Sequence, residues 1–468
     1  MHRSASPRLV RGVGLLLGLM LAGCAAGREQ AQPRVMIDWV DYERHANPSL
    51  LVNVPTGTQL GTKLSTSSFE ETWRAMARSA ERQLDLAFFY ASDAGPGGAL
   101  DPGRRTRLTE VVEQLEAAAA GDVAVRFLTD AGFVGTYPAL LERLEASPGI
   151  EVRRYTMPVL DAGGHVIEQP GPGDPRPGAM HAKYLILDGS SVALGSANFD
   201  WRALEHIHEL GVLVHDDGST QLVDAFQDVF DLDWHLADGG SLADAPQPRF
   251  GADQAPVLLE APGPGWSGAH TGYWPETSAT PVFSPRGLLP DERLWDLPRI
   301  VNAIDGAEET VRVQLLTYKP NDRDGYWEAL DGALRRAAAR GVEVRLLVAD
   351  WGKRSSVLPG LVSLTVLPNA EVRFVTIPPV GEAPEDHIPF ARVIHSKYLV
   401  ADNHTSWVGT ANWSRDYFES GRNVGLIIEG HNPALGLIRI HDELWDSEYA
   451  ETVEAGTNYV VPDFGERD

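Results

Sequence analysis

Cysteine is almost absent from this chain, since Cys24 is the only one among its 468 residues. A single thiol excludes an intramolecular disulfide and any zinc site built from several cysteines. Long apolar runs are missing as well: residues 13–22 form a run of about ten residues, too short to span a bilayer. Basic residues are scarce, because 40 Lys and Arg face 65 Asp and Glu, and the net charge is −25. This charge repels nucleic acid and anionic lipid, so an anionic substrate requires a local basic pocket.

The N-terminal run has the pattern of an export signal. Three basic residues, Arg3, Arg8 and Arg11, precede the apolar stretch. A basic start followed by a short apolar core predicts a signal peptide at residues 1–23 that is removed from the mature protein.

The end of this signal carries a second pattern, Leu21-Ala22-Gly23-Cys24, which resembles a bacterial lipobox. The resemblance implies that Cys24 is acylated and begins an anchor and N-terminal segment at 24–66. Ala25, rather than Asp, follows the cysteine, which by resemblance to enteric lipoproteins implies the outer membrane of a bacterial cell envelope. Two or three acyl chains would anchor the protein stably. The alternative is an ordinary secreted protein whose cleavage site contains a cysteine.

Beyond the anchor, the hydrophobic periodicity occurs in two similar copies. Helices are expected at 68–83 and 108–120, with strands at 84–90 and 123–128, and the second copy repeats this order with helices at 297–309 and 326–340 and strands at 311–318 and 342–348. Alternating helices and strands predict an α/β fold with a mixed sheet in each half. We expect a first half at 67–235, a Pro- and Gly-rich linker at 236–286, a second half at 287–450 and a tail at 451–468.

Each half contains the same short motif. His181-x-Lys183 is followed by Asp188 and by Gly195-Ser196-Ala197-Asn198, and His395-x-Lys397 is followed at the same spacing by Asp402 and by Gly409-Thr410-Ala411-Asn412. Residues two apart on a strand share a face, so each His and Lys should reach one pocket. The two aspartates are expected to hold turns. Four residues are expected to donate to phosphate oxygens: Ser196, Asn198, Thr410 and Asn412.

These motifs resemble the signature of the phospholipase D superfamily, and both copies are complete. A closer resemblance is to the animal lysosomal phospholipases D of types three and four and to the poxvirus envelope phospholipase. That closer resemblance rests on residues 195–202, 209–212, 281–285 and 412–418. It implies two α/β sandwich halves that form one bilobed unit, with a single active site between them.

The chemistry implied is cleavage of a phosphodiester in two steps. Lys183 and Lys397 neutralise the phosphate, one histidine attacks phosphorus, and the other protonates the leaving alcohol and then activates water or an acceptor alcohol. No metal and no other cofactor is required.

The roles of the two histidines depend on a partner. In the superfamily a carboxylate 28 positions beyond the motif histidine often orients its ring, and this step gives Glu209 from His181 and Asn423 from His395. A carboxylate raises imidazole basicity, whereas an amide orients the ring without a charge. His181 is therefore predicted to be the nucleophile and His395 the general acid and base. The alternative is that Glu209 only caps a strand and Asn423 is incidental.

Four aromatic residues are candidates for the substrate pocket: Tyr90, Tyr318, Trp413 and Tyr417. Packing in the core is the alternative for each of them. His206 and His208 lie near Glu209, but no further ligands with zinc-like spacing accompany them.

Two substrate classes stay open. The first hypothesis is hydrolysis or transfer of the phosphatidyl group of phospholipids, which the predicted anchor at Cys24 favours. The second is a 5′ exonuclease on single-stranded nucleic acid, which the resemblance implies equally well. A non-catalytic envelope protein is a third hypothesis, and the two intact motifs argue against it. The oligomeric state is open, and a homodimer is one possibility.

Overall fold

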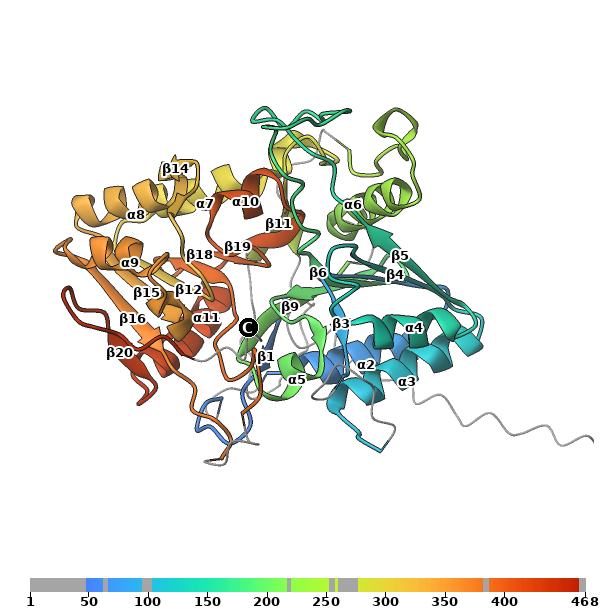
Figure 1. Cartoon of the computed structure of the whole chain (residues 1–468), viewed down its shortest axis with the longest axis horizontal. Coiled ribbons are helices and arrows are strands. Elements are labelled where there is room, and N and C mark those ends of the chain that lie inside the picture. Colours follow the sequence, from blue (N-terminus) through green and yellow to red (C-terminus); the bar gives the residue numbers. More distant parts are fainter. Residues whose placement is uncertain are drawn as a thin grey trace, which may run out of the picture. The chain divides into compact units, whose positions relative to one another are not determined.

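The computed structural model describes residues 48–61, 66–94, 103–216, 220–251, 257–259, 277–381 and 387–462. These residues form two large mixed sheets, one in each half of the chain, with helices on both faces of each sheet (Figure 1). The predicted α/β class with two similar halves is therefore confirmed. The predicted signal peptide and Cys24 lie outside the described residues.

The first sheet has seven strands in the order β1-β9-β7-β6-β2-β4-β5. They are β1 (Ser49–Asn53), β2 (Gln83–Phe88), β4 (Ala124–Asp130), β5 (Ile150–Tyr155), β6 (Lys183–Leu187), β7 (Ser191–Gly195) and β9 (Glu209–His215). Strands β2, β4 and β5 are parallel, and the other pairs are antiparallel. Helices α2 (Phe69–Ser79), α3 (Arg107–Ala120) and α4 (Pro138–Ala146) cover one face, and α6 (Leu222–Ala237) covers the other.

The second sheet repeats this arrangement with nine strands in the order β10-β11-β19-β18-β17-β12-β15-β16-β20. They are β10 (Val257–Leu259), β11 (Thr277–Ser284), β12 (Thr310–Leu315), β15 (Glu343–Ala349), β16 (Ala370–Val375), β17 (Tyr398–Ala401), β18 (Thr405–Gly409), β19 (Asn423–Glu429) and β20 (Ala450–Thr452). Helices α7 (Asp296–Gly306), α8 (Glu328–Arg340) and α9 (Leu358–Thr365) pack on one face, and α11 (His431–Trp445) packs on the other.

Short elements complete the two halves. They are β3 (Ala91–Ser92), β8 (Phe199–Asp200), α5 (Trp201–Glu205), β13 (Asn321–Asp322), β14 (Gly325–Tyr326), α10 (Arg415–Glu419) and the 3-10 turns η1 (Leu242–Asp244), η2 (Glu292–Leu294) and η3 (Asp350–Lys353). In the described part of the chain, no helix is long and apolar enough to cross a membrane.

The two halves share one hydrophobic core. A single cluster of buried side chains includes Phe226 and Phe230 of α6, Leu437 of α11, and residues from both sheets. The ring of Phe226 lies 5.0 Å from that of Phe283 on β11. Full burial of such a side chain contributes about 1.5–3 kcal/mol, so this shared core holds the two halves against each other.

Three predicted boundaries are wrong, because edge strands pair with partners far away in the sequence. Strand β1 adds residues before 67 to the first sheet, and β20 adds residues after 450 to the second. Residues 277–284, predicted as linker, form β11 and pair with β19.

Candidate active site

The two motifs meet where the halves touch. His181 lies just before β6 and His395 just before β17, and each is held by a backbone hydrogen bond to the opposite half. The amide of His181 donates to the carbonyl of Arg422 at 2.9 Å, and the amide of His395 donates to the carbonyl of His208 at 2.8 Å. Both rings are nearly buried, at 5% and 8% exposure. The predicted single site between the halves is therefore where both motifs lie.

The partners of the two histidines are crossed between the halves. Nδ1 of His395 lies 2.9 and 3.0 Å from the two carboxylate oxygens of Glu209, whereas Nδ1 of His181 lies 3.1 Å from Oδ1 of Asn423. The prediction that Glu209 orients His181 is wrong, and so is the argument that a carboxylate partner makes His181 the nucleophile, because the carboxylate belongs to His395. The reason is geometric: each partner stands at the start of a strand, β9 or β19, whose preceding residue pairs with the other half's motif segment.

The amide of Asn423 fixes the tautomer of His181. Its Nδ2 donates to the carbonyl of Tyr417 at 2.7 Å, so Oδ1 is the atom that faces the imidazole. An acceptor at this place requires the hydrogen of His181 on Nδ1, which leaves the lone pair of Nε2 free. Asn423, which the sequence spacing assigned to His395, therefore keeps His181 neutral and leaves its Nε2 free to act as the nucleophile.

Ser196 and Thr410 brace these partners instead of facing the substrate. The hydroxyl of Ser196 donates to the carboxylate of Glu209, and that of Thr410 donates to Oδ1 of Asn423 at 3.0 Å. Both residues are fully buried. The prediction that they bind phosphate is therefore corrected, because their hydroxyl hydrogens are already used.

Asn198 and Asn412 stay candidates for phosphate binding through their side-chain nitrogens. Both residues are buried, and the side-chain oxygen of each has no hydrogen-bond partner among the described residues. An amide oxygen only accepts hydrogen bonds, as a phosphate oxygen does, so these two oxygens require a donor such as a hydroxyl group, and only the NH2 groups can donate to phosphate. Phosphate binding by the two residues therefore stays a prediction.

The two motif lysines bring positive charge into a buried site. Nζ of Lys183 donates to the carbonyl of His181 at 2.7 Å, and Nζ of Lys397 donates to the carbonyl of His395. Burial lowers the pKa of Lys397 to about 7 and, together with the charge of Lys397, lowers the pKa of Lys183 well below its usual value. The charge of Glu209 acts against this lowering at both lysines, and an anionic phosphate in the site would likewise favour their charged forms.

Burial also changes the acid and base groups. It raises the pKa of Glu209 to about 7, and burial with the two lysine charges lowers the pKa of both histidines well below the ordinary value. Near neutral pH the buried pair of Glu209 and His395 therefore holds one proton between a carboxylate oxygen and Nδ1.

The motif aspartates hold strand starts together. Asp188 accepts hydrogen bonds from the amides of Glu81, Arg82 and Gln83, where β2 begins. Asp402 does the same for three amides at the start of β12. Both have a positive φ, 50° and 53°, which Asp tolerates better than most residues.

Aromatic rings surround His181 on two sides. The rings of Phe89 and Tyr417 lie 4.9 and 4.8 Å from the imidazole. Tyr90 is half-buried. Its ring stacks on Phe133 and lies 5.0 Å from the tilted ring of Tyr137, which forms an aromatic row next to Phe89. Phe89 was missed in the sequence, because an apolar residue inside an apolar strand looks like core.

Tyr318 and Trp413 do not reach the substrate pocket. Each is only 1% exposed and belongs to the core of the second half. The hydroxyl of Tyr318 is bound to Asp331. Their prediction as pocket residues is wrong, since both side chains pack into that core.

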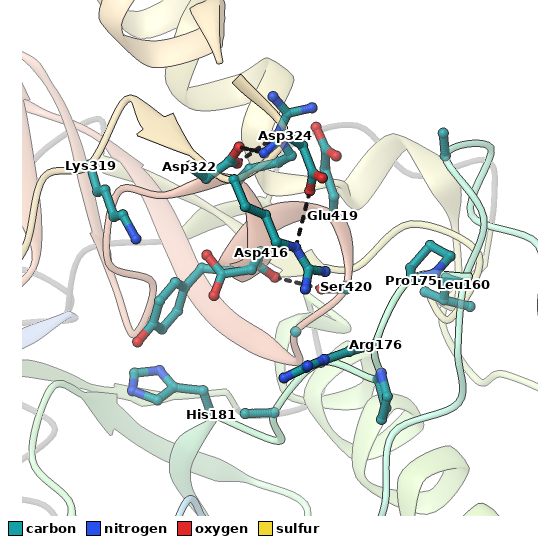
Figure 2. A pocket seen from close by; sticks show the side chains of 18 of the residues that line it. Leu160, Pro175, Arg176, His181, Lys319, Asp322, Asp324, Asp416, Glu419 and Ser420 are labelled. Atoms are coloured by element: carbon teal, nitrogen blue, oxygen red, sulfur yellow. Dashed lines mark hydrogen bonds and ion pairs between the residues drawn. The ribbon is translucent and has the colours of Figure 1, made fainter. Parts of the chain in front are cut away.

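A cavity of about 690 Å³ opens beside His181. It is lined by Phe89 and by a loop that contains Arg176 in the first half, and by Lys319, Arg415 and Tyr417 in the second (Figure 2). Among the described residues no group of three or more His, Cys, Asp or Glu side chains could hold a metal ion. The site offers two imidazoles and two ammonium groups around one reacting centre, which suits phosphoryl transfer.

Known proteins resemble this chain over most of its length. A family model described as cardiolipin synthase, PLD-like domain, matches residues 74–234 and 300–445. Phospholipase D Z of Dictyostelium discoideum is 28% identical over 418 residues, which cover 85% of this chain and 89% of that protein. The 5′-3′ exonuclease PLD4 of Mus musculus is 32% identical over 400 residues, which cover 81% of this chain and 74% of that protein.

Solved structures agree at the level of the fold. The crystal structure of phosphatidylserine synthase from Haemophilus influenzae superposes with a TM-score of 0.52 at 12% identity, over 82% of this chain and 85% of that one. At this identity the likeness shows the fold alone. Since the family model matches both halves with their motifs, and the mouse relative is matched over most of its length, this chain belongs to the phospholipase D-like family of phosphodiesterases.

Proposed function

We propose that the protein hydrolyses or transfers the phosphatidyl group of phospholipids through a phosphohistidine on His181. The observation that carries this proposal is the crossed bracing of the two histidines, Asn423 on His181 and Glu209 on His395. One ring has an uncharged amide as its partner and the other has a carboxylate, so one ring can act as the nucleophile and the other as the acid and base. A two-step reaction needs both roles.

In the first step, Nε2 of His181 forms a bond to phosphorus while the bond from phosphorus to the leaving alcohol oxygen breaks. His395 gives the hydrogen on its Nε2 to that oxygen, and its Nδ1 takes up the proton it shares with Glu209. Lys183 and Lys397, held at the carbonyls of the two histidines, offset the charge that develops on the phosphoryl oxygens.

In the second step, Nε2 of His395 is a free base. It takes a proton from water or an acceptor alcohol, whose oxygen forms the new bond to phosphorus as the bond to His181 breaks. Glu209 stabilises the resulting imidazolium, which restores the starting state. Asn423 carries no charge, so it keeps His181 neutral between turnovers.

A lipid substrate is supported by the relatives. Phospholipases D are among those that match most of this chain, such as phospholipase D Z. The net charge of −25 disfavours a long nucleic acid and an anionic lipid surface alike, so it does not separate the two substrate classes.

A 5′ exonuclease activity on single-stranded nucleic acid is the second candidate. The mouse relative carries that name. The aromatic row of Tyr90, Phe133 and Tyr137 beside the site is of the kind that stacks bases.

One assay separates the two functions. The purified chain would be offered short-chain phosphatidylglycerol and 5′-hydroxyl single-stranded DNA at equal phosphodiester concentration, with His181→Ala and His395→Ala as blanks. We expect faster release of glycerol than of nucleotide, and both blanks inactive. Faster nucleotide release would reverse the order of the two candidates, and turnover by either blank would contradict the shared-site mechanism.

We further propose that Cys24 is acylated and anchors the protein to the bacterial cell envelope, in the outer membrane because Ala25 follows the cysteine. Mass spectrometry of the mature N-terminus tests this. Cys24→Ser should lose the acyl chains and leave the detergent fraction, whereas a mature N-terminus at any other residue would refute the anchor.

A further inference from the structure

A second buried carboxylate lies directly behind the first motif. Asp130 is the last residue of β4 and is only 7% exposed. One of its carboxylate oxygens accepts a hydrogen bond at 2.8 Å from the amide of Met180, the residue before His181. The other oxygen accepts one at 2.8 Å from the amide of Gly132. Both donors are neutral amides, so they hold the carboxylate in place without cancelling its charge.

Phe89 connects this carboxylate with the motif. The amide of Asp130 donates to the carbonyl of Phe89 at 3.3 Å, and the amide of Phe89 donates to the carbonyl of Ala182 at 3.1 Å. The ring of Phe89 lies 4.9 Å from that of His181, and Nζ of Lys183 lies 5.2 Å from the centre of the same ring. Asp130 is therefore at the end of the sheet where the motif histidine and lysine stand.

The second half has no counterpart of this carboxylate. In the parallel pair β2 and β4, Asp130 follows the last paired residue, Thr129. In the matching pair β12 and β15, the residue that follows the last paired residue, Val348, is Ala349. Ala349 is fully buried and carries no charge. The fold itself therefore does not require an acid at this position, because the second sheet forms the same ladder with alanine.

The charges around Lys183 come from several elements. Burial lowers the pKa of Lys183 well below its usual value and the charge of Lys397 lowers it further, whereas the charges of Glu209 and Asp130 raise it. Both motif histidines also face Lys183, and burial with the lysine charges lowers the pKa of each, so they add no positive charge at neutral pH. Burial raises the pKa of Asp130, and backbone amides and the charge of Lys183 oppose this rise.

We infer that Asp130 is a positioning residue for the nucleophile and for the lysine of the first motif. Its carboxylate fixes the backbone before His181 through the amide of Met180, and its negative charge favours the ammonium form of Lys183. Glu209 is negative as well, but it exchanges a proton with its histidine during the proposed reaction, whereas Asp130 takes no part in proton transfer. The inference rests on the proposed reaction at His181 and holds for a lipid and for a nucleic acid substrate.

The test follows kcat/KM from about pH 5 to about pH 8 with the faster of the two substrates of the function assay. Asp130→Asn keeps an oxygen that can accept from the amide of Met180 but removes the charge. Lys183 should then lose its proton at a lower pH than in the intact chain. The ratio of kcat/KM in the variant to that in the intact chain should therefore be near one at acidic pH and fall by about threefold to tenfold as the pH rises.

Three further variants separate the charge of Asp130 from its hydrogen bond. Asp130→Ala removes both, so it should add a loss of activity that is the same at every pH. Asp130→Glu keeps the charge, and its ratio should not vary with pH. The matched control is Asp350→Asn, because Asp350 is a buried carboxylate of the second half that interacts with Lys353 and Thr376. This control should keep kcat/KM unchanged at every pH, and thermal unfolding shows whether each variant is folded.

The failures are distinguishable. If the intact chain cleaves neither substrate, the proposed function fails. If it cleaves one and the ratio for Asp130→Asn is the same at every pH, the inference is wrong while the function stands. An equal fall in Asp350→Asn would assign the effect to any loss of buried charge and would also overturn it. If Asp130→Asn did not fold, a constant ratio in Asp130→Glu would support the inference, and a ratio that fell with pH would overturn it.

Discussion

The crossed pairing of the histidines makes Glu209→Gln a sharp test of their roles. Glutamine keeps the shape of the side chain and an oxygen that faces Nδ1 of His395, but it cannot hold the proton that the pair shares. Glu209 contacts His395 and not His181. The substitution should therefore impair proton transfer to the leaving group and leave the attack on phosphorus largely intact.

The size of the effect follows from the charged hydrogen bond that the substitution removes. A hydrogen bond to a charged group contributes about 1.5–3 kcal/mol, and about 1.4 kcal/mol corresponds to tenfold in rate. With an alkyl leaving group, which needs a proton, kcat should fall by about 10- to 150-fold. With p-nitrophenol as the leaving group, which departs as a stable anion, formation of the phosphoenzyme should change by less than about threefold.

The assay is a rapid quench with labelled substrates of both kinds, which measures the phosphoenzyme on peptides that contain His181. Asn423→Ala is the mirror variant, because it removes the partner of His181. It should slow phosphoenzyme formation with both leaving groups. If Glu209→Gln slowed formation equally with p-nitrophenol, or if the label appeared on His395 in a His181→Ala background, the role assignment would be refuted.

The charges of the site and the motif aspartates lead to three further expectations. Because burial lowers the pKa of Lys397 to about 7, the charge of Lys397 is lost as the pH rises through that value, and kcat/KM should decline above about pH 7. In Lys397→Arg the guanidinium stays charged, so a decline that persists unchanged in this variant would show that another group causes it. Because lysine charge offsets the phosphate, EDTA should leave the turnover rate unaltered, and a complete loss reversed by a divalent cation would contradict the mechanism. Asp402→Ala should lower the free energy of unfolding by about 1–3 kcal/mol in urea titrations. Burial raises the pKa of Asp402, but hydrogen bonds from three backbone amides outweigh burial and lower this pKa below its ordinary value. The stabilisation by Asp402 is therefore present above the ordinary pKa and is lost as the pH falls through the lowered value. If the loss of stability in Asp402→Ala stayed constant down to about pH 2, the role of the Asp402 charge would be refuted.

Local features could be predicted from the sequence, because they depend on neighbours along one strand. The spacing of His181 and Lys183 places both on one face of a strand start, and the periodicity around residues 84–90 and 108–120 predicted β2 and α3. The repeat also predicted that the second half would match the first. These inferences need no knowledge of how the halves meet.

Features that join the halves could not be read in this way. Asn423 lies 242 positions from His181 in the sequence and contacts it in the fold. No local sequence pattern shows whether the partner of each histidine comes from its own half or from the other half. The hydroxyls of Ser196 and Thr410 lie at the predicted place, but only the position of β9 and β19 shows that they point away from the substrate.

The crossed bracing has a consequence for how such an enzyme can diversify. In a dimer of identical chains, one codon would encode the partner residues of both histidines. Any substitution would therefore change both partners together and keep the two histidines equivalent. When both halves belong to one polypeptide, Glu209 and Asn423 are separate codons, and each ring can acquire its own chemistry. With both copies in one polypeptide, one histidine can thus specialise as the proton donor and the other as the nucleophile.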